Sequence, residues 1–316
     1  MKKVAIIGAG TIAKPLSIRL KAKGVNVCFS LRRNHQGPTF EELLAREKPQ
    51  AVFVAISTLD KGEAARDYIL ASVKAGIPVI TCEKGAFAYH AKALLPHLDK
   101  IGFSATVGGG TRMLKYVAGR HLADKQVEIH AVVNGTLNFI FDSEQSLGEA
   151  CGEASRLGYA EPGASDPLSL INGELKDVGM KICDFFNTVL AKNEFITPKR
   201  LGSFTLTTKD LEELSQEGGN RRMVVSFTNK TPPKELRRLG KQFGPRCIDG
   251  WHITGSFRQI TQASQLSSWL PGGVGNAVHI IEGKLGSGGI YTLSGPGAGP
   301  EPTTSAMLAD FDELCG

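Results

Sequence analysis

Residues 3–13 read KVAIIGAGTIA, a short apolar run that passes directly into a glycine-rich turn. An apolar run without polar alternation is typical of a strand that is buried on both faces of a sheet. The apolar spacing that follows is helical, and Pro15 falls in the first turn, where a helix tolerates proline. The stretch therefore predicts a buried strand, a tight turn and a helix in direct succession.

The turn has the pattern G-x-G-x-x-A. Gly8 permits the tight turn, Gly10 lets the backbone approach a pyrophosphate, and Ala13 allows the helix to pack closely on the strand. The free N–H groups at the start of the helix are donors for phosphate oxygens. Together with the intervening Thr11 and Ile12, these residues are the predicted binding site for a dinucleotide cofactor.

Strand-like and helix-like segments continue to alternate up to about residue 107. Strands are predicted at 25–31, 51–56, 78–82 and 102–107, and helices near 39–47 and 61–75. Such alternation is typical of an α/β fold with a doubly wound parallel sheet of the Rossmann type. An α/β domain that binds no nucleotide is the alternative.

The end of the second predicted strand bears on the choice of cofactor. An NAD-specific site usually places an acid there to bind the ribose 2′-hydroxyl, whereas this chain has Arg32 and Arg33. Two guanidinium groups suit a 2′-phosphate, so NADP is the preferred cofactor and NAD stays open. The alternative is that both arginines simply face water.

A second domain of mixed type is predicted after about residue 126. Further strands are predicted at 127–133 and near 222–228, 252–260 and 276–282, and helices at 134–148 and from about 174 to 190. The glycine-rich turn and helix at 295–311 are expected to return to the first domain. We therefore predict a Rossmann nucleotide-binding domain of residues 1–125 and 294–316, and an α+β catalytic and dimerisation domain of residues 126–293.

The composition is that of a globular protein, with 41% hydrophobic residues and a net charge of +6 over 316 residues. Apolar runs fall far short of the roughly 20 residues that span a bilayer, and the amino terminus lacks a long apolar segment. A cytoplasmic protein without membrane contact is expected. The densest basic stretch, 234–246, has helical spacing without interleaved aromatic residues, which favours a solvated helix face over a nucleic-acid-binding arm.

Two features of the second domain are open to a structural or a catalytic interpretation. The stretch GYAEPGASDP at 158–167 has the composition of a surface loop. Asp177 and Lys181 lie four residues apart on a predicted helix, so both project from one face. On an exposed helix they would form an ordinary ion pair. Beside a reacting carbonyl, the lysine could instead stabilise developing negative charge or donate a proton.

Seven segments, in order along the chain, together resemble those of homoserine dehydrogenases. They are GAGTIA (8–13), VITCEKGAFA (79–88), TVGGGT (106–111), NGTLNFI (134–140), GYAE with DP (158–167), DVGMK (177–181) and GPGAGPEPTTSA (295–306). The resemblance implies a homodimer that interconverts L-homoserine and L-aspartate 4-semialdehyde by hydride transfer with a nicotinamide cofactor. This reaction belongs to threonine and methionine biosynthesis.

The resemblance also implies roles for individual residues. Lys181 would be the catalytic lysine with Asp177 as its partner at the substrate, and Lys84 would lie between the nicotinamide and the substrate. Glu161 would bind the substrate's ammonium group. The other implied residues are Thr136, Gly158 and Tyr159 at the substrate, and Ser57, Thr58 and Gly299 at the cofactor.

The chain departs from the family's pattern in the substrate region. Four residues separate Glu161 from Asp166, where the family commonly has one, and two residues are inserted within NGELKD before Asp177. The pairing of Asp177 with Lys181 is retained, but the family's pattern no longer defines the geometry of Asp177 relative to Glu161. Glu174, within NGELKD, is a competing acid for the substrate.

The resemblance further implies a monovalent-cation site with incomplete ligands. The family places an acid just before its A-T-V-G segment, and this chain has Ser104 there. The carbonyl groups of Val107, Gly109 and Thr111 would still bind sodium, but less tightly. Because the chain ends after the predicted final helix, the regulatory domain of some members is not expected.

Two other functions stay open on the sequence. One is another Rossmann reductase of an amino-acid semialdehyde or an imino acid, since Glu161 could hold other ammonium groups. The other is a non-catalytic regulator that binds NADPH. Retention of both Lys84 and Lys181 argues against the regulator, because a binding protein has no chemical need for both.

Overall fold

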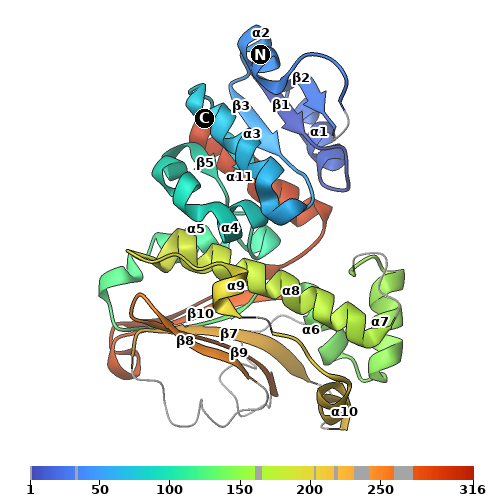
Figure 1. Cartoon of the computed structure of the whole chain (residues 1–316), viewed down its shortest axis with the longest axis vertical. Helices are drawn as coiled ribbons and strands as arrows, with labels where there is room; N and C mark the ends of the chain where they lie inside the picture. Colours follow the sequence, from blue (N-terminus) through green and yellow to red (C-terminus); the bar gives the residue numbers. More distant parts are fainter. Residues whose placement is uncertain are drawn as a thin grey trace.

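Five strands pair in parallel in the amino-terminal third, in the order β2-β1-β3-β4-β5 (Figure 1). The computed structural model describes residues 2–32, 35–160, 166–202, 204–216, 220–230, 242–259 and 273–316. The strands of this first sheet are β1 (Lys3–Ile7), β2 (Asn26–Leu31), β3 (Ala51–Val54), β4 (Val79–Thr81) and β5 (Ile101–Gly102). The helices of this part are α1 (Ala13–Ala22), α2 (Phe40–Glu47), α3 (Glu63–Lys74), α4 (Gly85–Leu94) and α5 (Met113–Ala118). The predicted Rossmann-type fold is confirmed.

Strand β1 shows why its apolar run lacks polar alternation. Ala5 and Ile7 pack into one core with α2, α3 and α4, while Val4 and Ile6 pack into a second core with α1 and the final helix, α11 (Pro300–Cys315). All four side chains are at most 2% exposed. Because helices cover both faces of the sheet, the side chains on both faces of this strand are apolar.

The predicted strand at 102–107 is wrong beyond Gly102. Strand β5 ends there, and the chain turns because the Phe103 carbonyl accepts hydrogen bonds from the N–H of Thr106 at 3.1 Å and from its hydroxyl at 2.9 Å. Val107, the last residue of the apolar pattern, lies in the core beneath the second sheet rather than in the first sheet. Its burial therefore comes from tertiary packing and not from strand pairing.

Six antiparallel strands form the second sheet, in the order β11-β10-β6-β7-β9-β8. They are β6 (Val127–Val132), β7 (Arg221–Thr228), β8 (Gln242–Ile248), β9 (Trp251–Gln259), β10 (Gly275–Glu282) and β11 (Gly289–Pro296). The helices here are α6 (Gly135–Asp142), α7 (Leu147–Arg156), α8 (Pro167–Phe185), α9 (Pro198–Leu201) and α10 (Thr208–Gln216). Helices α6, α7 and α8 share one core with this sheet, and α8 runs across the sheet on the side of the first domain (Figure 1). The α+β character predicted for this part is confirmed.

Strand β8 shows that the predicted solvated helix over 234–246 is wrong for residues 242–246. Residues from 242 to 248 pair antiparallel with β9, and residues 231–241 lie outside the described part of the chain. The hairpin turns at Asp249 and Gly250, whose φ angles are 52° and 80°. Positive φ at both central residues is typical of a type I′ turn, for which Asp-Gly is a strong signal. The helical spacing of the basic residues obscured that signal.

Helix α8 starts at Pro167 rather than near residue 174 as predicted. Asp166 caps it by accepting the N–H of Ser169 at 2.9 Å, and Pro167 occupies the first helical position. The chain continues as a π-helix over Phe186–Leu190.

Among the described residues, no helix combines the length and the apolar character that crossing a membrane requires.

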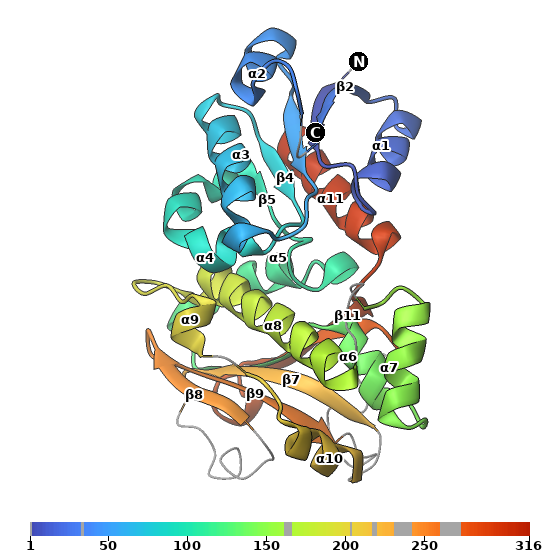
Figure 2. The ribbon, with the colours of Figure 1, turned by 45° about the vertical axis from the view of Figure 1, so that its right-hand side comes forward.

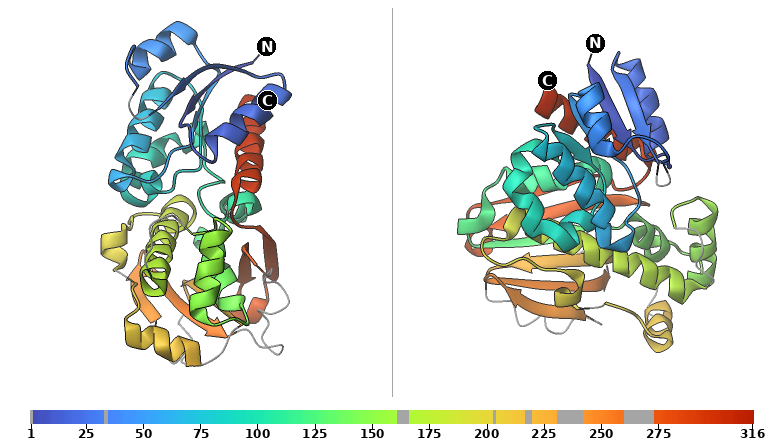
Figure 3. Two further views of the ribbon diagram at one scale, coloured as in Figure 1. Left: turned by 90° about the vertical axis from the view of Figure 1, so that its right-hand side faces the viewer. Right: turned by 45° about the horizontal axis from the view of Figure 1, so that its top comes forward.

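The final helix returns to the first sheet, as predicted (Figure 2). The ring of Phe311 on α11 lies 5.4 Å from the ring of Phe53 on β3. Arg19 on α1 donates to the hydroxyls of Thr304 and Ser305, both at 2.8 Å. Both chain ends therefore lie at the first sheet, and the second sheet is built from the intervening chain (Figure 3, left).

Candidate active site

The residues that follow the first four strands lie at one edge of the first sheet. Gly8 follows β1, Arg32 follows β2, Ser57 follows β3 and Lys84 follows β4, and these strands are parallel. Strand β1 lies between β2 and β3, so the chain leaves this edge in opposite directions on either side of β1. Ligands of open α/β sheets bind at such a switch point, outside the carboxyl ends of the strands.

The glycine turn fits close approach of a ligand. Gly8 has a φ of 127°, and a Cβ on it would lie 2.1 Å from the Ala55 carbonyl oxygen, so a side chain here is excluded. A Cβ on Gly10 would meet nothing within 4 Å, which leaves open space in front of the turn. Helix α1 has no side-chain cap and no acid in its first turn. Its first N–H groups therefore face a region suited to an anion.

The two arginines predicted to select the cofactor are only partly described. Arg32 is exposed at the end of β2, and Arg33 lies outside the described residues. Gly299 is the third glycine implied at the cofactor. It directly precedes α11 and has a φ of 107°. Its carbonyl accepts the N–H of Thr303 at 3.3 Å in the first turn of that helix.

Lys84, Asp177 and Lys181 form an ion triad between the two sheets. Lys84 precedes α4 and its Nζ lies 2.7 Å from Asp177 Oδ1, while Lys181 Nζ lies 2.8 Å from Asp177 Oδ2. The Asp177–Lys181 pair spans one turn of α8, whereas Lys84 follows β4 of the first sheet. The three candidate catalytic residues are therefore brought together by the packing of α4 on α8.

The triad is largely buried and strongly coupled. The side chains of Lys84, Asp177 and Lys181 are 22%, 20% and 16% exposed. Burial by itself would raise the pKa of Asp177, but the ammonium groups of Lys181 and Lys84 outweigh it and hold that pKa well below its usual range. Asp177 is therefore an anion throughout the neutral pH range, with one ammonium group at each oxygen.

Asn134 is a polar residue of the site that the sequence analysis did not single out. Its Nδ2 donates to Glu174 Oε2 at 2.7 Å and to Asp177 Oδ2 at 3.1 Å. Its Oδ1 accepts the N–H of Leu137 at 2.8 Å and so caps α6. An Asn-Gly pair before an apolar helical run is an N-cap signal, but the two acids that Asn134 contacts are about 40 residues away in sequence.

Thr136 and the end of α7 lie beside this cluster. The Thr136 hydroxyl donates to the Tyr159 carbonyl at 2.8 Å, and the Tyr159 ring packs edge-on against Phe139 at 5.2 Å. Gly158 ends α7 with a φ of 73°, the conformation that glycine adopts most readily after a helix. Glu161, the expected ammonium ligand, lies outside the described residues.

Two buried acids lie near Lys84. Glu83 accepts the N–H groups of Gly85 at 2.7 Å and Ala86 at 2.8 Å, and the Thr58 hydroxyl also donates to it. Asp184, one turn beyond Lys181 on α8, is fully buried, and burial raises its pKa well above the usual range, with a further increase from Glu83. A raised pKa favours the neutral carboxyl group. Asp184 therefore contributes less negative charge near the two lysines than Asp177 does.

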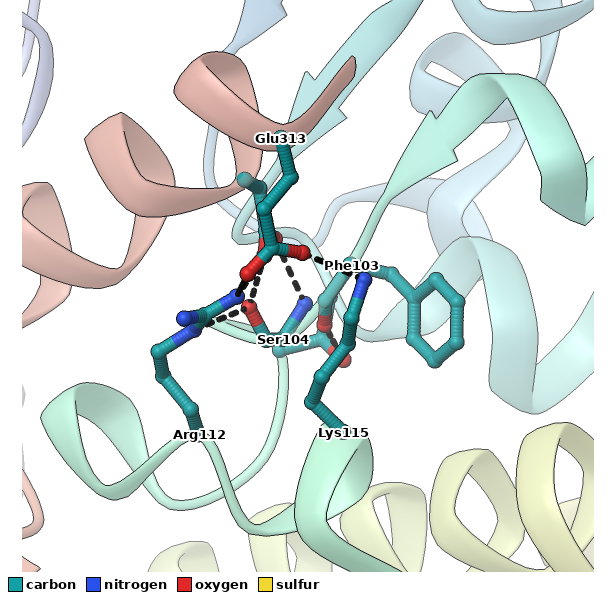
Figure 4. Close-up of polar contacts among 7 residues, drawn as sticks. Phe103, Ser104, Arg112, Lys115 and Glu313 are labelled. Carbon is teal, nitrogen blue, oxygen red and sulfur yellow. Dashed lines mark hydrogen bonds and ion pairs between the residues drawn. The ribbon is translucent and has the colours of Figure 1, made fainter. Parts of the chain in front are cut away.

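A second polar cluster joins α11 to the loop after β5 (Figure 4). The Asp310 carboxylate accepts the N–H of Ser104 at 2.9 Å, the Ser104 hydroxyl, and Arg112 Nη2 at 3.0 Å. Arg112 also pairs with Glu313 at 2.6 Å, and Glu313 pairs with Lys115 at 2.6 Å. A guanidinium group is therefore fixed beside Ser104, which stands where the family's cation site has an acid.

Comparison with known proteins identifies relatives over most of the chain. Residues 113–311 match the family model described as homoserine dehydrogenase. The homoserine dehydrogenase of Lactococcus lactis subsp. lactis (strain IL1403) is 27% identical over 283 residues, which are 86% of this chain and 59% of that protein. The NAD(+)-dependent homoserine dehydrogenase of Pseudomonas canavaninivorans is 28% identical over 259 residues, which are 79% of this chain and 66% of that protein. The chain thus spans less than two thirds of the length of these curated relatives.

Solved structures share the fold. A putative homoserine dehydrogenase from Archaeoglobus fulgidus superimposes with a TM-score of 0.69 at 21% identity, over 99% of both chains. A hyperthermophilic archaeal homoserine dehydrogenase in complex with NADPH gives a TM-score of 0.66 at 21% identity, over 99% of this chain and 98% of that one. The arrangement of both sheets is therefore shared with these two proteins.

Proposed function

The chain belongs to the homoserine dehydrogenase family, and on that premise we propose that it interconverts L-homoserine and L-aspartate 4-semialdehyde by hydride transfer with a nicotinamide cofactor. The observation that carries the proposal is the ion triad. It holds two ammonium groups on one carboxylate, that of Lys84, which follows β4 of the first sheet, and that of Lys181 on α8. A reductase can use such cations to stabilise the negative charge that develops on the carbonyl oxygen.

The lysines act on the oxygen atom of the substrate. During reduction of the aldehyde, this oxygen gains negative charge, and a fixed cation or donor aimed at it lowers the barrier; one such donor is worth about 3–4 kcal/mol. We propose that Lys181 donates the proton that converts the oxygen to a hydroxyl, and that Lys84 stabilises the developing charge. Asp177 orients both ammonium groups. In the oxidation direction a lysine accepts the hydroxyl proton, so alkaline pH favours that direction.

The residues of the first sheet fit a bound dinucleotide. A nicotinamide supplies or accepts the hydride when bound. Gly8, Gly10 and the first N–H groups of α1 would hold the pyrophosphate, because Gly8 allows the tight turn, open space lies in front of Gly10, and the helix start has no side-chain cap. The other residues proposed at the cofactor are Thr11, Ile12, Ala13, Arg32, Arg33, Ser57, Thr58, Lys84 and Gly299.

We propose that NADP is preferred over NAD because Arg32 and Arg33 can bind the 2′-phosphate. Replacing both by alanine should weaken NADPH binding by about ten- to one-hundred-fold, the range expected for lost hydrogen bonds to a charged group, and leave NADH binding nearly unchanged. Fluorescence titration with each nucleotide measures this. Arg46→Ala on α2 is the control for loss of an exposed arginine. Equal weakening of both nucleotides would contradict the phosphate role.

The substrate pocket is proposed to lie on the α8 side of the triad. Thr136, Tyr159 and Gly158 would line it, and Glu161 would bind the ammonium group, as the resemblance implies. We further propose that residues 126–293 are the catalytic and dimerisation domain, that residues 1–125 and 294–316 are the nucleotide-binding domain, and that the protein is a homodimer. Sedimentation of the purified protein tests the dimer.

We propose that the carbonyl groups of Val107, Gly109 and Thr111 bind a sodium ion less tightly than in the family, because Ser104 stands where the family's cation site has an acid. The Ser104 hydroxyl already donates to the Asp310 carboxylate, and the Arg112 guanidinium group lies beside both, 3.3 Å from the Ser104 hydroxyl and 3.0 Å from Asp310 Oδ1. The expected ligands Val107, Gly109 and Thr111 surround Gly108, whose own carbonyl accepts the Thr111 N–H at 3.0 Å and hydroxyl at 2.8 Å.

The proposed activity is tested by mixing purified protein with L-homoserine and NADP⁺ at alkaline pH and following the absorbance of the reduced nicotinamide. We expect steady turnover, and turnover in the reverse direction with L-aspartate 4-semialdehyde and NADPH. Omission of homoserine is the control for unrelated oxidation. Protein that turns over neither substrate with either NADP or NAD would contradict the proposal.

A further inference from the structure

A buried carboxylate directly precedes Lys84 in the chain. Glu83 is 2% exposed. Its Oε1 accepts the N–H of Gly85 at 2.7 Å and the Thr58 hydroxyl, and its Oε2 accepts the N–H of Ala86 at 2.8 Å. Both carboxylate oxygens are therefore bonded to donors of the protein itself, and the mechanism proposed above does not use this acid.

These bonds supply a helix cap that Lys84 cannot supply itself. Lys84 is the N-cap residue of α4, and its side chain makes no capping hydrogen bond, because an ammonium group has donors and no acceptor. A cation also has the unfavourable sign at the amino terminus of a helix. The Glu83 carboxylate compensates for both, since it accepts the first two N–H groups of α4 and places a negative charge at the start of the helix.

The same residue joins α4 to the loop after β3. Thr58 lies on that loop, and a Cβ on Gly85 would lie 2.5 Å from Thr58 Cγ2 and 2.8 Å from Glu83 Oε1. The backbone N–H of Glu83 donates to the Thr81 hydroxyl at 3.0 Å, which donates in turn to the Val54 carbonyl of β3 at 3.1 Å. Glu83 is thus held at its backbone and at its side chain, and the loop packs directly on the start of α4.

The place of the Lys84 ammonium group depends on where α4 starts. Lys84 Nζ lies 2.7 Å from Asp177 on α8, and the two backbone N–H groups that follow Lys84 are bound by Glu83. A shift of the helix start would move the ammonium group relative to Asp177 and to the substrate. Misplacing a catalytic group by about 1 Å can lower a rate by about a hundredfold.

We propose that Glu83 is a positioning residue, which holds the start of α4 so that the Lys84 ammonium group is fixed toward the reacting oxygen. This inference rests on the proposed function, in which Lys84 stabilises the developing charge. Glu83 acts through Lys84 and is not itself a catalytic residue, because both of its oxygens are already bonded to the protein. Through Thr58, the same carboxylate ties the ammonium group to the loop proposed to border the nicotinamide.

A double-mutant cycle with Lys84 separates this role from a merely structural one. Glu83→Gln removes the charge and replaces one oxygen by an amide nitrogen, which cannot accept a helix N–H. We expect kcat for L-homoserine oxidation to fall by about tenfold, and KM for L-homoserine and NADPH binding to change by less than about threefold. In the Lys84→Met background no ammonium group is left to position, so the same substitution should change kcat by less than about threefold.

Glu63→Gln is the matched control, because Glu63 is an exposed acid in the first turn of α3, and its loss should leave kcat unchanged. If Glu83→Gln yields no folded protein that binds NADPH, Glu83→Asp is put through the same cycle. This variant keeps the charge but withdraws the carboxylate from the helix start by one methylene group, and the same outcomes are expected.

An equal fold loss of kcat with and without the Lys84 ammonium group would mean that Glu83 supports only the fold, and would overturn the inference. An unchanged kcat in the Glu83 variant would overturn it as well. Both outcomes leave the proposed function standing. A wild-type protein that does not oxidise L-homoserine would overturn the proposed function, and the inference with it.

Discussion

We expect Lys181→Ala to lower kcat for L-homoserine oxidation by about 10²–10³-fold, the effect seen when one well-placed donor to a developing charge is removed. The reason is that the Lys181 ammonium group is fixed by Asp177 at 2.8 Å and by the Val133 carbonyl at 2.9 Å, so it is already oriented before substrate binds. Binding of NADPH, measured by fluorescence titration, should stay within a few-fold of wild type because Lys181 lies on α8, which packs on the second sheet and not on the first.

Lys176→Ala is the matched control for this change. Lys176 is exposed on the same helix, so its replacement by alanine has the same effect on helix formation. The rate of homoserine oxidation should not change. A Lys181→Ala variant with a wild-type rate would show that the catalytic lysine is another residue. A variant that also loses NADPH binding would point to a folding defect instead.

The second large effect is expected from Asp177→Asn. Asparagine has nearly the same shape but leaves two ammonium groups, of Lys84 and Lys181, without their shared carboxylate. Removing one partner of a buried ion pair costs about 3–5 kcal/mol, and since the triad is about one fifth exposed we expect a loss near the lower end in the free energy of unfolding. Homoserine oxidation should fall as well, because both lysines lose the carboxylate that orients them.

The difference in the free energy of unfolding between wild type and Asp177→Asn should depend on pH. The folded pKa of Asp177 is depressed, so its contribution is fully present above the unfolded pKa of about 3.9 and is lost as pH falls below that value. Urea unfolding of wild type and Asp177→Asn should therefore differ most from about pH 5 upward, and the two curves should converge under acid conditions. A constant difference down to pH 3 would contradict the ionised triad.

Local patterns predicted the elements whose formation depends on nearby residues. The run KVAII became β1 because an apolar strand fits a sheet covered on both faces, and Gly8 is required because a side chain there would overlap the Ala55 carbonyl. The pair of Asp177 and Lys181 was predictable from the helical repeat alone. The start of α8 was not placed correctly, although Asp166 and Pro167 are ordinary start signals.

The predictions that were wrong concern segments whose structure is set by distant partners. Residues 242–246 have helical spacing but form a strand because β9 offers a pairing edge across the Asp249–Gly250 turn. Val107 continues an apolar strand pattern but packs into the core of the second sheet. Strand propensity depends on what the strand packs against, so such segments are ambiguous in sequence.

By itself, the sequence determined the nucleotide-binding type of fold, the family and one half of the ion triad, because each depends on short-range spacing or on an ordered set of motifs. The tertiary structure alone decided that Lys84, which follows β4 of the first sheet, joins Asp177 on α8, and that Asn134 ties Asp177 to Glu174. A contact between residues 40 to 100 positions apart requires α4, α6 and α8 to pack together. No local periodicity encodes the relative placement of three helices.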